Sequence, residues 1–482
     1  MESIPQLKPN RFEKICLTNV RVWARAQAND KAIDWLDGED SGEIRVPPYA
    51  ITSVPFSPES IPRAYVMLKP DGSLWKEGTL YLYERALQQG TKSTTASNIA
   101  GDLAHFMNAM RDSNKDFLDF EGPSFRRPTY RYKITLQNSI KRGELSRLTA
   151  NRKISSMIGL YRWLTETRNF KPQQSMWTSK IRNISYEDRF GFRHTKAQLC
   201  TDLTFKNAQS ISTGEYIEDG GKLYPISRDN QTSLMKALVN LDNPEMLLVH
   251  VIALVTGMRI QSILTLRHHS IKQNLTEKDD KTLTGLKIGM GSSVEAKGQK
   301  AQTVLIPGWL HNQLSIYINS ERYKERMMKS RIKGLDGQYL FTTRTGRPYY
   351  IAEEDKELYD YSSEAGSAIR FFKTRIKEEL KRMGEHFNFR FHDLRATFGM
   401  NLIEDYLANP NNNINQLALI DLVKSRLNQN SIVVTMRYLK FRETHSLVAQ
   451  AQSEFEDHLR DIVIAQRSKY GLEDPPNSRF DN

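Results

Sequence analysis

The sequence of 482 residues contains only two cysteines, Cys16 and Cys200. Two thiols are too few for a zinc cluster or a framework of disulfides, and such low usage is typical of a reducing compartment. The sequence also lacks any run of about 18 apolar residues and any basic segment followed by an apolar one at its start. We therefore expect neither a membrane span nor a secretory signal, and we expect a cytoplasmic protein.

Two common catalytic motifs are absent as well. The sequence has no Walker A loop, which would cradle a nucleotide phosphate, and no HExxH motif, which would bind zinc. It thus offers no local pattern for a nucleotide or a metal cofactor.

The sequence contains fewer acidic than basic residues, with 56 Asp and Glu and 69 Lys and Arg. Its formal net charge is therefore +13, and its pI is near 9.4. The excess is concentrated in residues 91–190, which contain 18 Lys and Arg and 9 Asp and Glu. The total charge alone is equally compatible with a solubility feature. Its concentration in one segment is typical of a surface that binds a phosphate backbone.

The basic segment has the periodicity of helices. Apolar residues recur at spacings of three and four from Ile154 to Leu164, and again in the stretch TKSTTASNIAGDLAHFMNAM. Arg152 and Arg162 lie off the apolar stripe, and together with Lys153 they are candidates for contacts to DNA. An ordinary basic bundle of helices fits the same pattern.

Three short stretches carry the side chains of phosphoryl-transfer chemistry. They are TGMRIQSILTL with Arg259, FHDLRATFGMNL with His392 and Arg395, and VVTMRYLKF with Tyr438. A guanidinium can donate two parallel hydrogen bonds to phosphate oxygens, and this chemistry depends above all on positioning and charge neutralisation. A tyrosine, with an ordinary pKa of about 10, attacks only where positive charge or a base eases its proton away. The two arginines and the histidine can supply that setting.

Local signals place these residues on helices. An Asn-Pro-Glu start at 243–245 and a closing Gly257 predict a buried helix that ends just before Arg259. Arg259 then lies at the edge of a second, short helix. In FHDLRATFGMNL the apolar residues form one helical stripe, so His392 and Arg395, three residues apart, project together beside it.

In this order, the three stretches resemble the catalytic motifs of the tyrosine recombinases, also called phage-type integrases. The family's first arginine corresponds to Arg259 in TGMRI, and its His-x-x-Arg pair to His392 and Arg395 in HDLR. Its nucleophile corresponds to Tyr438 in TMRYLK. The separations also fit, with 136 residues between the arginines and 43 from Arg395 to Tyr438. Each residue alone is more often a surface or core side chain, and the conjunction favours the catalytic interpretation.

The family also has a lysine on a β-hairpin, which protonates the departing 5′ oxygen. The stretch VEAKGQKAQTVLIP predicts two strands joined by a turn at Gly298 and Gln299. Lys297 is the better match to that lysine and Lys300 is the alternative. Residues 338–349, QYLFTTRTGRPY, resemble the strand and turn that close the family's small sheet.

Two positions depart from the family pattern. Gln429 stands where a histidine or tryptophan usually donates a hydrogen bond to the scissile phosphate. Its amide is a donor without positive charge, so either the site tolerates a neutral donor or the activity is reduced. Ser262 stands where the family often has an acidic residue, at a position that is usually only supportive.

Length and composition predict several domains, because 482 residues exceed one ordinary core. We expect an N-terminal region at 1–72, a helical core-binding domain at 73–190, a linker at 191–222 and a catalytic domain at 223–482. The resemblance covers about residues 78–445. It implies a mainly α fold with a small β-sheet in the catalytic domain: a C-shaped, multidomain DNA clamp made of a helical core-binding domain and an α+β catalytic domain. Residues 1–72 match no known pattern, and they either bind accessory DNA or pack on the rest.

The C-terminal segment has its own pattern. Apolar residues recur at spacings of three and four from Val448 to Ile462, which predicts an amphipathic helix. Such a helix most often packs on its own domain, but in the tyrosine recombinases, which this sequence resembles, it often docks on a neighbouring protomer. The resemblance implies a homotetramer on two double-stranded DNA sites, with accessory DNA-bending or directionality proteins as further partners and a location at the bacterial nucleoid.

The resemblance implies a site-specific recombinase that integrates or excises a mobile element. Tyr438 would attack a phosphodiester to give a 3′-phosphotyrosyl link and a free 5′ hydroxyl. Because that link retains the energy of the broken bond, no cofactor is needed. Two alternatives stay open: a type IB topoisomerase or telomere resolvase with the same residues, and a DNA-binding regulator without catalysis, which the neutral Gln429 suggests.

Overall fold

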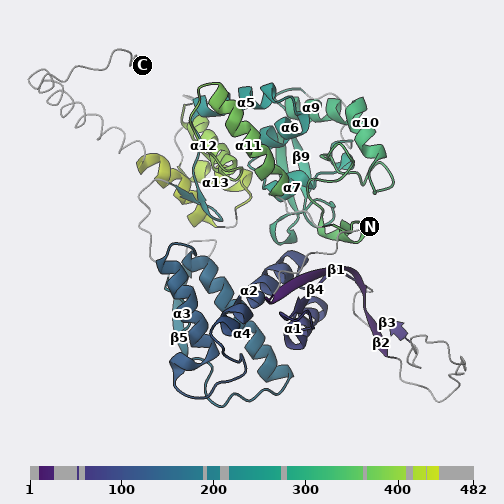
Figure 1. Cartoon of the computed structure of the whole chain (residues 1–482). Helices are drawn as coiled ribbons and strands as arrows, with labels where there is room; N and C mark the ends of the chain where they lie inside the picture. Colours follow the sequence, from purple (N-terminus) through teal and green to yellow (C-terminus); the bar gives the residue numbers. More distant parts are fainter. Residues whose placement is uncertain are drawn as a thin grey trace, which may run out of the picture. The chain divides into compact units, whose positions relative to one another are not determined.

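The computed structural model describes ten stretches of the chain (Figure 1), namely residues 10–25, 51–53, 60–88, 90–187, 193–206, 216–272, 279–361, 366–408, 416–429 and 431–444. The chain divides into two compact units. Unit 1 consists of Met1–Ser185, Thr195–Gln209 and Glu353–Ser362, and unit 2 of Tyr186–His194, Ser210–Ala352 and Ser363–Asn482. The predicted C-terminal helix at 448–462 lies outside the described residues.

Unit 1 is a small helical bundle with a long two-stranded sheet. Its elements are β1 (Glu13–Arg21), β2 (Trp23–Arg25), β3 (Ile51–Ser53), β4 (Ser60–Leu68), α1 (Lys76–Gln88), α2 (Ser93–Asp112), η1 (Ser124–Arg126), α3 (Pro128–Lys141), α4 (Arg147–Thr167) and η3 (Glu353–Leu358). The strands pair antiparallel as β1 with β4 and β2 with β3. A further pair, β5 (Ser179–Glu187) with β6 (Arg193–Thr201), forms its own two-stranded sheet.

Helix α2 organises unit 1, because it contacts α1, α3, α4 and both strands of the β1–β4 sheet (Figure 1). Its apolar face, with Leu103 and Phe106, meets the apolar stripe of α4, in which Ile154 and Tyr161 are fully buried. The two helices predicted from the sequence of residues 91–190 are thus confirmed. Helix α4 begins after Ser146, whose hydroxyl accepts a hydrogen bond from the Thr149 amide, as an N-cap does.

Unit 2 contains most of the helices. Its elements are β7 (Ile217–Glu218), β8 (Lys222–Leu223), α5 (Arg228–Asn240), α6 (Pro244–Thr256), α7 (Ile260–Leu264), α8 (His268–Lys272), β9 (Leu283–Ile288), η2 (Lys297–Gln299), β10 (Gln302–Pro307), α9 (Gly308–Asn319), α10 (Glu321–Met328), α11 (Ser367–Arg382), α12 (Asp393–Ala408) and α13 (Gln416–Arg426). Residues 432–444 are also helical.

The core of unit 2 is built around α6 and α12, which pack on each other. Helix α6 has the predicted caps, since the Asn243 side chain accepts from the Met246 amide and Gly257 ends the helix in the left-handed region at φ 65°. In α12 every residue from Asp393 to Met400 is buried. This helix therefore holds its functional side chains inside the unit, where neighbouring helices fix their positions.

The small sheet of unit 2 differs from the sequence prediction. Strand β10 pairs antiparallel with β9 at Leu283–Ile288, and not with the predicted strand at 294–297. The chain leaves β9 at Gly289, whose φ of 90° breaks the strand, and the glycines at 289 and 291 both have positive φ. The predicted turn is confirmed, because Gly298 and Gln299 have φ of 72° and 52°. Residues 338–349 contribute isolated bridges, Arg267 to Tyr339 and Thr342 to Pro348, and no third strand.

Over the described residues the chain is mainly helical, with small two-stranded sheets, as expected from the sequence. Among those residues, no helix has the length and apolar character needed to cross a membrane.

Candidate active site

Arg259 lies where two helices of unit 2 meet. It is the N-cap residue of α7 and follows directly on the left-handed turn at Gly257 that ends α6. A Cβ on Gly257 would stand 2.6 Å from the Phe398 ring, so this turn allows α6 to approach α12 closely. Burial and the charge of Arg395 lower the pKa of Arg259. Arg259 and Arg395 also line the same pocket, so both can act on one anion bound there.

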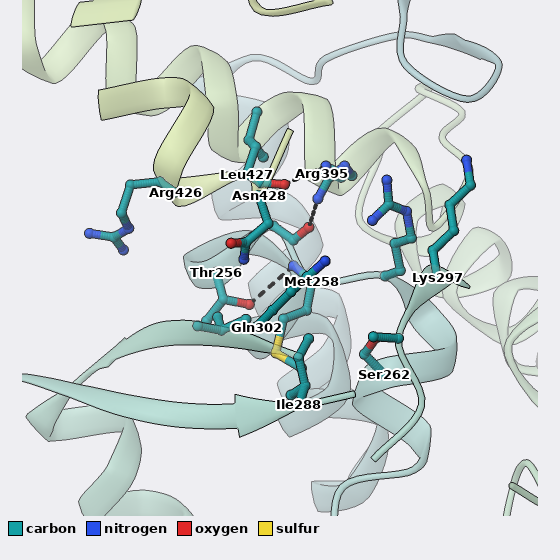
Figure 2. Close-up of a pocket in the computed structure, with 14 residues that line it drawn as sticks. Thr256, Met258, Ser262, Ile288, Lys297, Gln302, Arg395, Arg426, Leu427 and Asn428 are labelled. Atoms are coloured by element: carbon teal, nitrogen blue, oxygen red, sulfur yellow. Dashed lines mark hydrogen bonds between the residues drawn. The ribbon is translucent and has the colours of Figure 1, made fainter. Parts of the chain in front are cut away.

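Arg395, in the first turn of α12, is held by three acceptors. Its Nε donates to Asp219 Oδ2 at 3.0 Å. Its Nη1 and Nη2 donate to the carbonyls of Gly257 and Leu427, both at 2.7 Å (Figure 2). Only 3% of the residue is exposed. A buried cation with this many fixed contacts is preorganised for an anionic partner.

His392 lies one residue before α12 begins, and the Arg395 amide donates to its carbonyl at 3.2 Å. The predicted pair is therefore presented by the start of α12. Burial and the charge of Arg395 lower the pKa of His392, against an opposing effect of Asp219. A histidine with a pKa below 6.5 is neutral at pH 7 and can accept a proton.

Tyr438 is fully buried, with 0% of the residue exposed. It lies in the helical stretch 432–444 and packs against α12 at Gly399, where an added Cβ would stand 2.5 Å from Tyr438 Cε1. Its hydroxyl donates to Asp219 Oδ2 at 3.0 Å. Burial and the charge of Asp219 raise the pKa of Tyr438, while the charges of Arg395 and Arg259 oppose the rise.

Gln429 reaches the same place from the turn after α13. Its Nε2 donates to Asp219 Oδ2 at 3.0 Å, and its Oε1 accepts from the Thr435 hydroxyl at 2.7 Å. Because the Asp219 carboxylate can only accept, its contact fixes which end of the amide faces the site, and the NH₂ group points toward Asp219. Asn428, at φ 49°, makes the sharp turn that presents Gln429.

Lys297 and Lys300 flank the turn at Gly298 and Gln299, which lies within η2, and both lysines are exposed. Lys297 lines a pocket with Arg259, Arg395 and Ser262, and in Figure 2 it approaches the pocket from the side opposite to Arg426. Lys300 lines a neighbouring pocket with Gln429. The structure thus brings both lysines to the edge of the site, and Lys297 lies on the side of the two arginines.

Asp219 also lies in the candidate site, and the sequence analysis did not predict it there. It lies in the tight turn between β7 and β8, in the segment predicted to be a linker, and only 7% of it is exposed. Burial opposes its ionisation, but the charge of Arg395 and three hydrogen bonds outweigh that effect and lower the pKa of Asp219. The signal for a hairpin was present in IEDGGKL, where two apolar residues flank Asp-Gly-Gly.

The hairpin that carries Asp219 is fastened to α12. The Tyr224 amide donates to Asp393 Oδ1 and the Ile226 amide donates to Thr397 Oγ1, both at 3.1 Å. Ile217 and Leu223 are buried in one cluster with Tyr438. Asp219 is therefore positioned by the same elements that position the predicted catalytic residues.

The predicted DNA contacts of unit 1 lie on α4. Arg152 and Lys153 both face the buried Asp102, with Arg152 Nη1 at 2.7 Å and Lys153 Nζ at 3.8 Å from its carboxylate. Their side chains are 46% and 13% exposed, so Lys153 is poorly placed to reach a partner. Arg162 is exposed. Among the basic residues predicted on α4, Arg162 and Arg152 are thus the ones open to a ligand.

Comparison with known proteins gives similar structures but no related sequence. No protein-family model matches the sequence, and no curated protein matches it. Solved integrases and a recombinase resemble this chain. The Tn1549 transposon integrase in complex with transposon right end DNA has 14% identity and a TM-score of 0.42, over 78% of this chain and 98% of that one.

Two further structures are similar at a lower level. A lambda integrase dimer bound to a COC′ core site has 13% identity and a TM-score of 0.38, covering 76% of this chain and 94% of that one. XerA recombinase has 14% identity and a TM-score of 0.29, covering 79% and 98%. At these values the likenesses assign no activity, so the function of this chain has to be inferred from its own residues.

The arrangement has the parts of a phosphoryl-transfer site. A tyrosine hydroxyl, a buried arginine and an amide donor converge on one anionic oxygen, with a second arginine and a neutral histidine beside them. Within the described part of the chain, no group of His, Cys, Asp and Glu is arranged to hold a metal ion.

Proposed function

We propose that this chain is a site-specific DNA recombinase of the tyrosine type, which integrates or excises a mobile element. The observation that carries the proposal is the convergence of Tyr438, Arg395 and Gln429 on one carboxylate oxygen, each at 3.0 Å. An anionic oxygen is thus bound next to a candidate nucleophile. In the proposed complex with DNA, a non-bridging oxygen of the scissile phosphate takes that position.

The proposed chemistry is a pair of transesterifications. The Tyr438 oxygen attacks phosphorus, its proton passes to His392, and the bond from phosphorus to the 5′ oxygen breaks. Lys297, or Lys300 as the alternative, gives a proton to the departing oxygen, while Arg259 and Arg395 neutralise the charge that develops on the phosphate. The 5′ hydroxyl of a second DNA strand then reverses the step and restores the free tyrosine.

The proposed substrate is double-stranded DNA held by both units, with accessory DNA-bending or directionality proteins as further partners. Arg162 and Arg152 on unit 1 and Lys300 on unit 2 contact its phosphates in this proposal. Four copies of the chain acting on two DNA sites complete the assembly. In this proposal the segment 448–462 docks on a neighbouring copy. Deleting residues 446–482 should then abolish assembly on DNA, while a single copy should still bind DNA.

Covalent trapping tests the proposal. The substrate is a pool of labelled duplexes of random sequence, each nicked near its centre, so that the short released strand diffuses away and the adduct accumulates. Wild type is compared with Tyr438→Phe and with the control Tyr224→Phe, which removes a hydroxyl from a tyrosine that is 44% exposed. We expect a DNA-linked band on a denaturing gel for wild type and the control, and none for Tyr438→Phe.

The trapped DNA separates the proposal from its alternatives. A recurrent sequence among the adducts supports the recombinase. Adducts without sequence preference, together with relaxation of a supercoiled plasmid, would instead support a type IB topoisomerase. Duplex binding without any adduct would support a DNA-binding regulator that lacks catalysis.

A further inference from the structure

One carboxylate oxygen occupies the centre of the candidate active site. Asp219 Oδ2 accepts three hydrogen bonds, from Arg395 Nε, from Gln429 Nε2 and from the Tyr438 hydroxyl, all at 3.0 Å. The three donors come from α12, from the turn after α13 and from the helical stretch 432–444. Parts of the chain more than 170 residues from Asp219 in sequence thus meet at a single acceptor atom.

The donors around Asp219 are those that the proposed reaction directs at the scissile phosphate. A carboxylate and a phosphodiester each carry one negative charge on their oxygens, so both make the same hydrogen bonds to an arginine and an amide. The two anions cannot share the position, because each would repel the other and the donors are few. DNA can therefore enter only when the carboxylate has left.

We propose that Asp219 is an autoinhibitory plug: its carboxylate occupies the place of the scissile phosphate and holds Tyr438 in an unreactive state until DNA displaces it. The inference rests on the function proposed above. It goes beyond that function, because it assigns this chain an inhibited resting state and names the group that imposes it.

The alternative role for Asp219 would be that of the base that takes the proton of Tyr438. The pKa of Asp219 lies below its ordinary value of 3.8, and the pKa of Tyr438 lies above its ordinary value of 10.0. A proton transfer from Tyr438 to Asp219 is therefore uphill, because the lowered pKa of Asp219 and the raised pKa of Tyr438 both oppose it. Asp219 is thus a strong acceptor of hydrogen bonds and a weak base, which fits a plug.

The geometry of the hairpin indicates which part moves. On one side of Asp219, Arg437 donates to the Glu218 carbonyl at 2.8 Å, and on the other side Arg390 donates to the Lys222 carbonyl. The turn between these anchors contains Gly220 and Gly221, at φ 70° and 155°, where a side chain would be strained. Release therefore requires movement of the Asp219 side chain and its glycine turn, and the anchored strands can stay in place.

Two measurements on the whole 482-residue chain test the plug. The variants are Asp219→Ala and the isosteric Asp219→Asn, with Glu218→Gln as the matched control. Glu218 is the adjacent residue, its side chain is 64% exposed, and its substitution removes the same charge. The first measurement is the stabilisation of each protein by inorganic phosphate in thermal unfolding, which needs no catalysis. The second is the rate of adduct formation at limiting concentrations of the nicked duplex pool.

We expect phosphate to stabilise Asp219→Ala at concentrations about tenfold lower than those that stabilise wild type. If roughly 90% of wild type is in the inhibited state, its apparent affinity for phosphate is about tenfold lower than that of a protein without the plug. Adduct formation at limiting DNA should rise by a similar factor. Asp219→Asn should change both in the same direction, and Glu218→Gln should match wild type. A normal melting curve without phosphate shows that each variant is folded.

The outcomes separate the plug from the proposed function. Asp219→Ala could bind phosphate more tightly than wild type while neither protein forms an adduct. That result would support the plug and contradict the recombinase. Adduct formation by wild type that is slower or unchanged in both Asp219 variants would overturn the plug. Loss of the adduct in Asp219→Asn with DNA binding intact would make Asp219 a catalytic base and would also overturn it.

Discussion

Gln429 is held at both ends of its amide, by Asp219 on the donor side and Thr435 on the acceptor side. The Gln429 side chain is therefore a fixed, uncharged hydrogen-bond donor to the place that the Asp219 carboxylate oxygen occupies. We predict that Gln429→Leu lowers the rate of adduct formation roughly 10- to 100-fold, since a hydrogen bond to a charged group contributes about 1.5–3 kcal/mol. Gln429→His should retain activity within a few-fold, because the imidazole also donates.

The control for this prediction is Gln416→Leu, an exposed position at the start of α13. Single-turnover trapping on the nicked duplex is the measurement. Equal rates for Gln429→Leu and Gln416→Leu would show that the amide does not contact the phosphate.

The protonation of His392 gives a second prediction at the residue scale. Burial and the charge of Arg395 hold the pKa of His392 below 6.5, so the imidazole is neutral at pH 7. Because only the neutral form accepts the phenol proton, adduct formation at limiting DNA should be level near pH 7 and fall as the pH drops through this lowered pKa. A pH–rate profile checks this, and an inflection above pH 6.5 would contradict it.

The residues of the site differ in how far sequence could predict them. Arg259, His392, Arg395 and Tyr438 lie in stretches with distinctive local patterns, and unit 2 brings them together. Asp219 has no such pattern, because a single aspartate beside two glycines is an ordinary turn. Its contacts with Arg395, Gln429 and Tyr438 span 176, 210 and 219 residues, so only the tertiary structure reveals them.

At the scale of elements, the contact between α12 and the helical stretch 432–444 depends on Gly399. A Cβ there would lie 2.5 Å from Tyr438 Cε1 and 2.8 Å from Cδ1, closer than atoms can pack. We predict that Gly399→Ala displaces the Tyr438 ring and lowers adduct formation about 100-fold, the effect of a misplacement of roughly 1 Å. Overpacking should also destabilise the protein by about 1–3 kcal/mol.

The matched control for the crowded glycine is Gly101→Ala in α2. A Cβ at that helical position meets only the end of the flexible Lys14 side chain, at 3.6 Å. This variant should be as stable as wild type or more stable, since alanine favours a helix. Thermal unfolding and trapping of both variants provide the comparison, and an active Gly399→Ala would contradict the packing argument.

The sequence predicted helices better than strands. Helix α6 has strong terminal signals in Asn243, Pro244 and Gly257, and it begins and ends as predicted. The prediction of the hairpin's first strand was wrong. The alternation of Val294 and Ala296 with polar residues is typical of a strand, but in the structure both residues are buried in a loop. The strand that pairs with β10 is Leu283–Ile288. Which segment pairs with β10 depends on tertiary packing, and the alternation of apolar and polar residues within one segment does not encode it.

At the scale of the whole molecule, the proposed binding to DNA should weaken steeply with salt, because basic side chains that contact phosphates displace counterions from the duplex. If both units contact the duplex, Arg162→Ala in unit 1 and Lys300→Ala in unit 2 should each reduce the slope of log K against log[salt] by about 0.9. Lys324→Ala, a surface lysine paired with Glu321 at 2.7 Å, is the control. Titration of a duplex at several salt concentrations gives the slopes, and an unchanged slope for either variant would remove that residue from the interface.

In the proposed reaction, Tyr438 becomes linked to a 3′ phosphate of DNA. The most direct measurement uses the same nicked duplex labelled either at the 5′ end or at the 3′ end of the cleaved strand, followed by proteolysis of the adduct. We predict that only the 5′-end label stays with the protein, on the peptide that contains Tyr438, and that the released strand has a 5′ hydroxyl. Retention of the 3′-end label, or a label on any other peptide, would contradict this account.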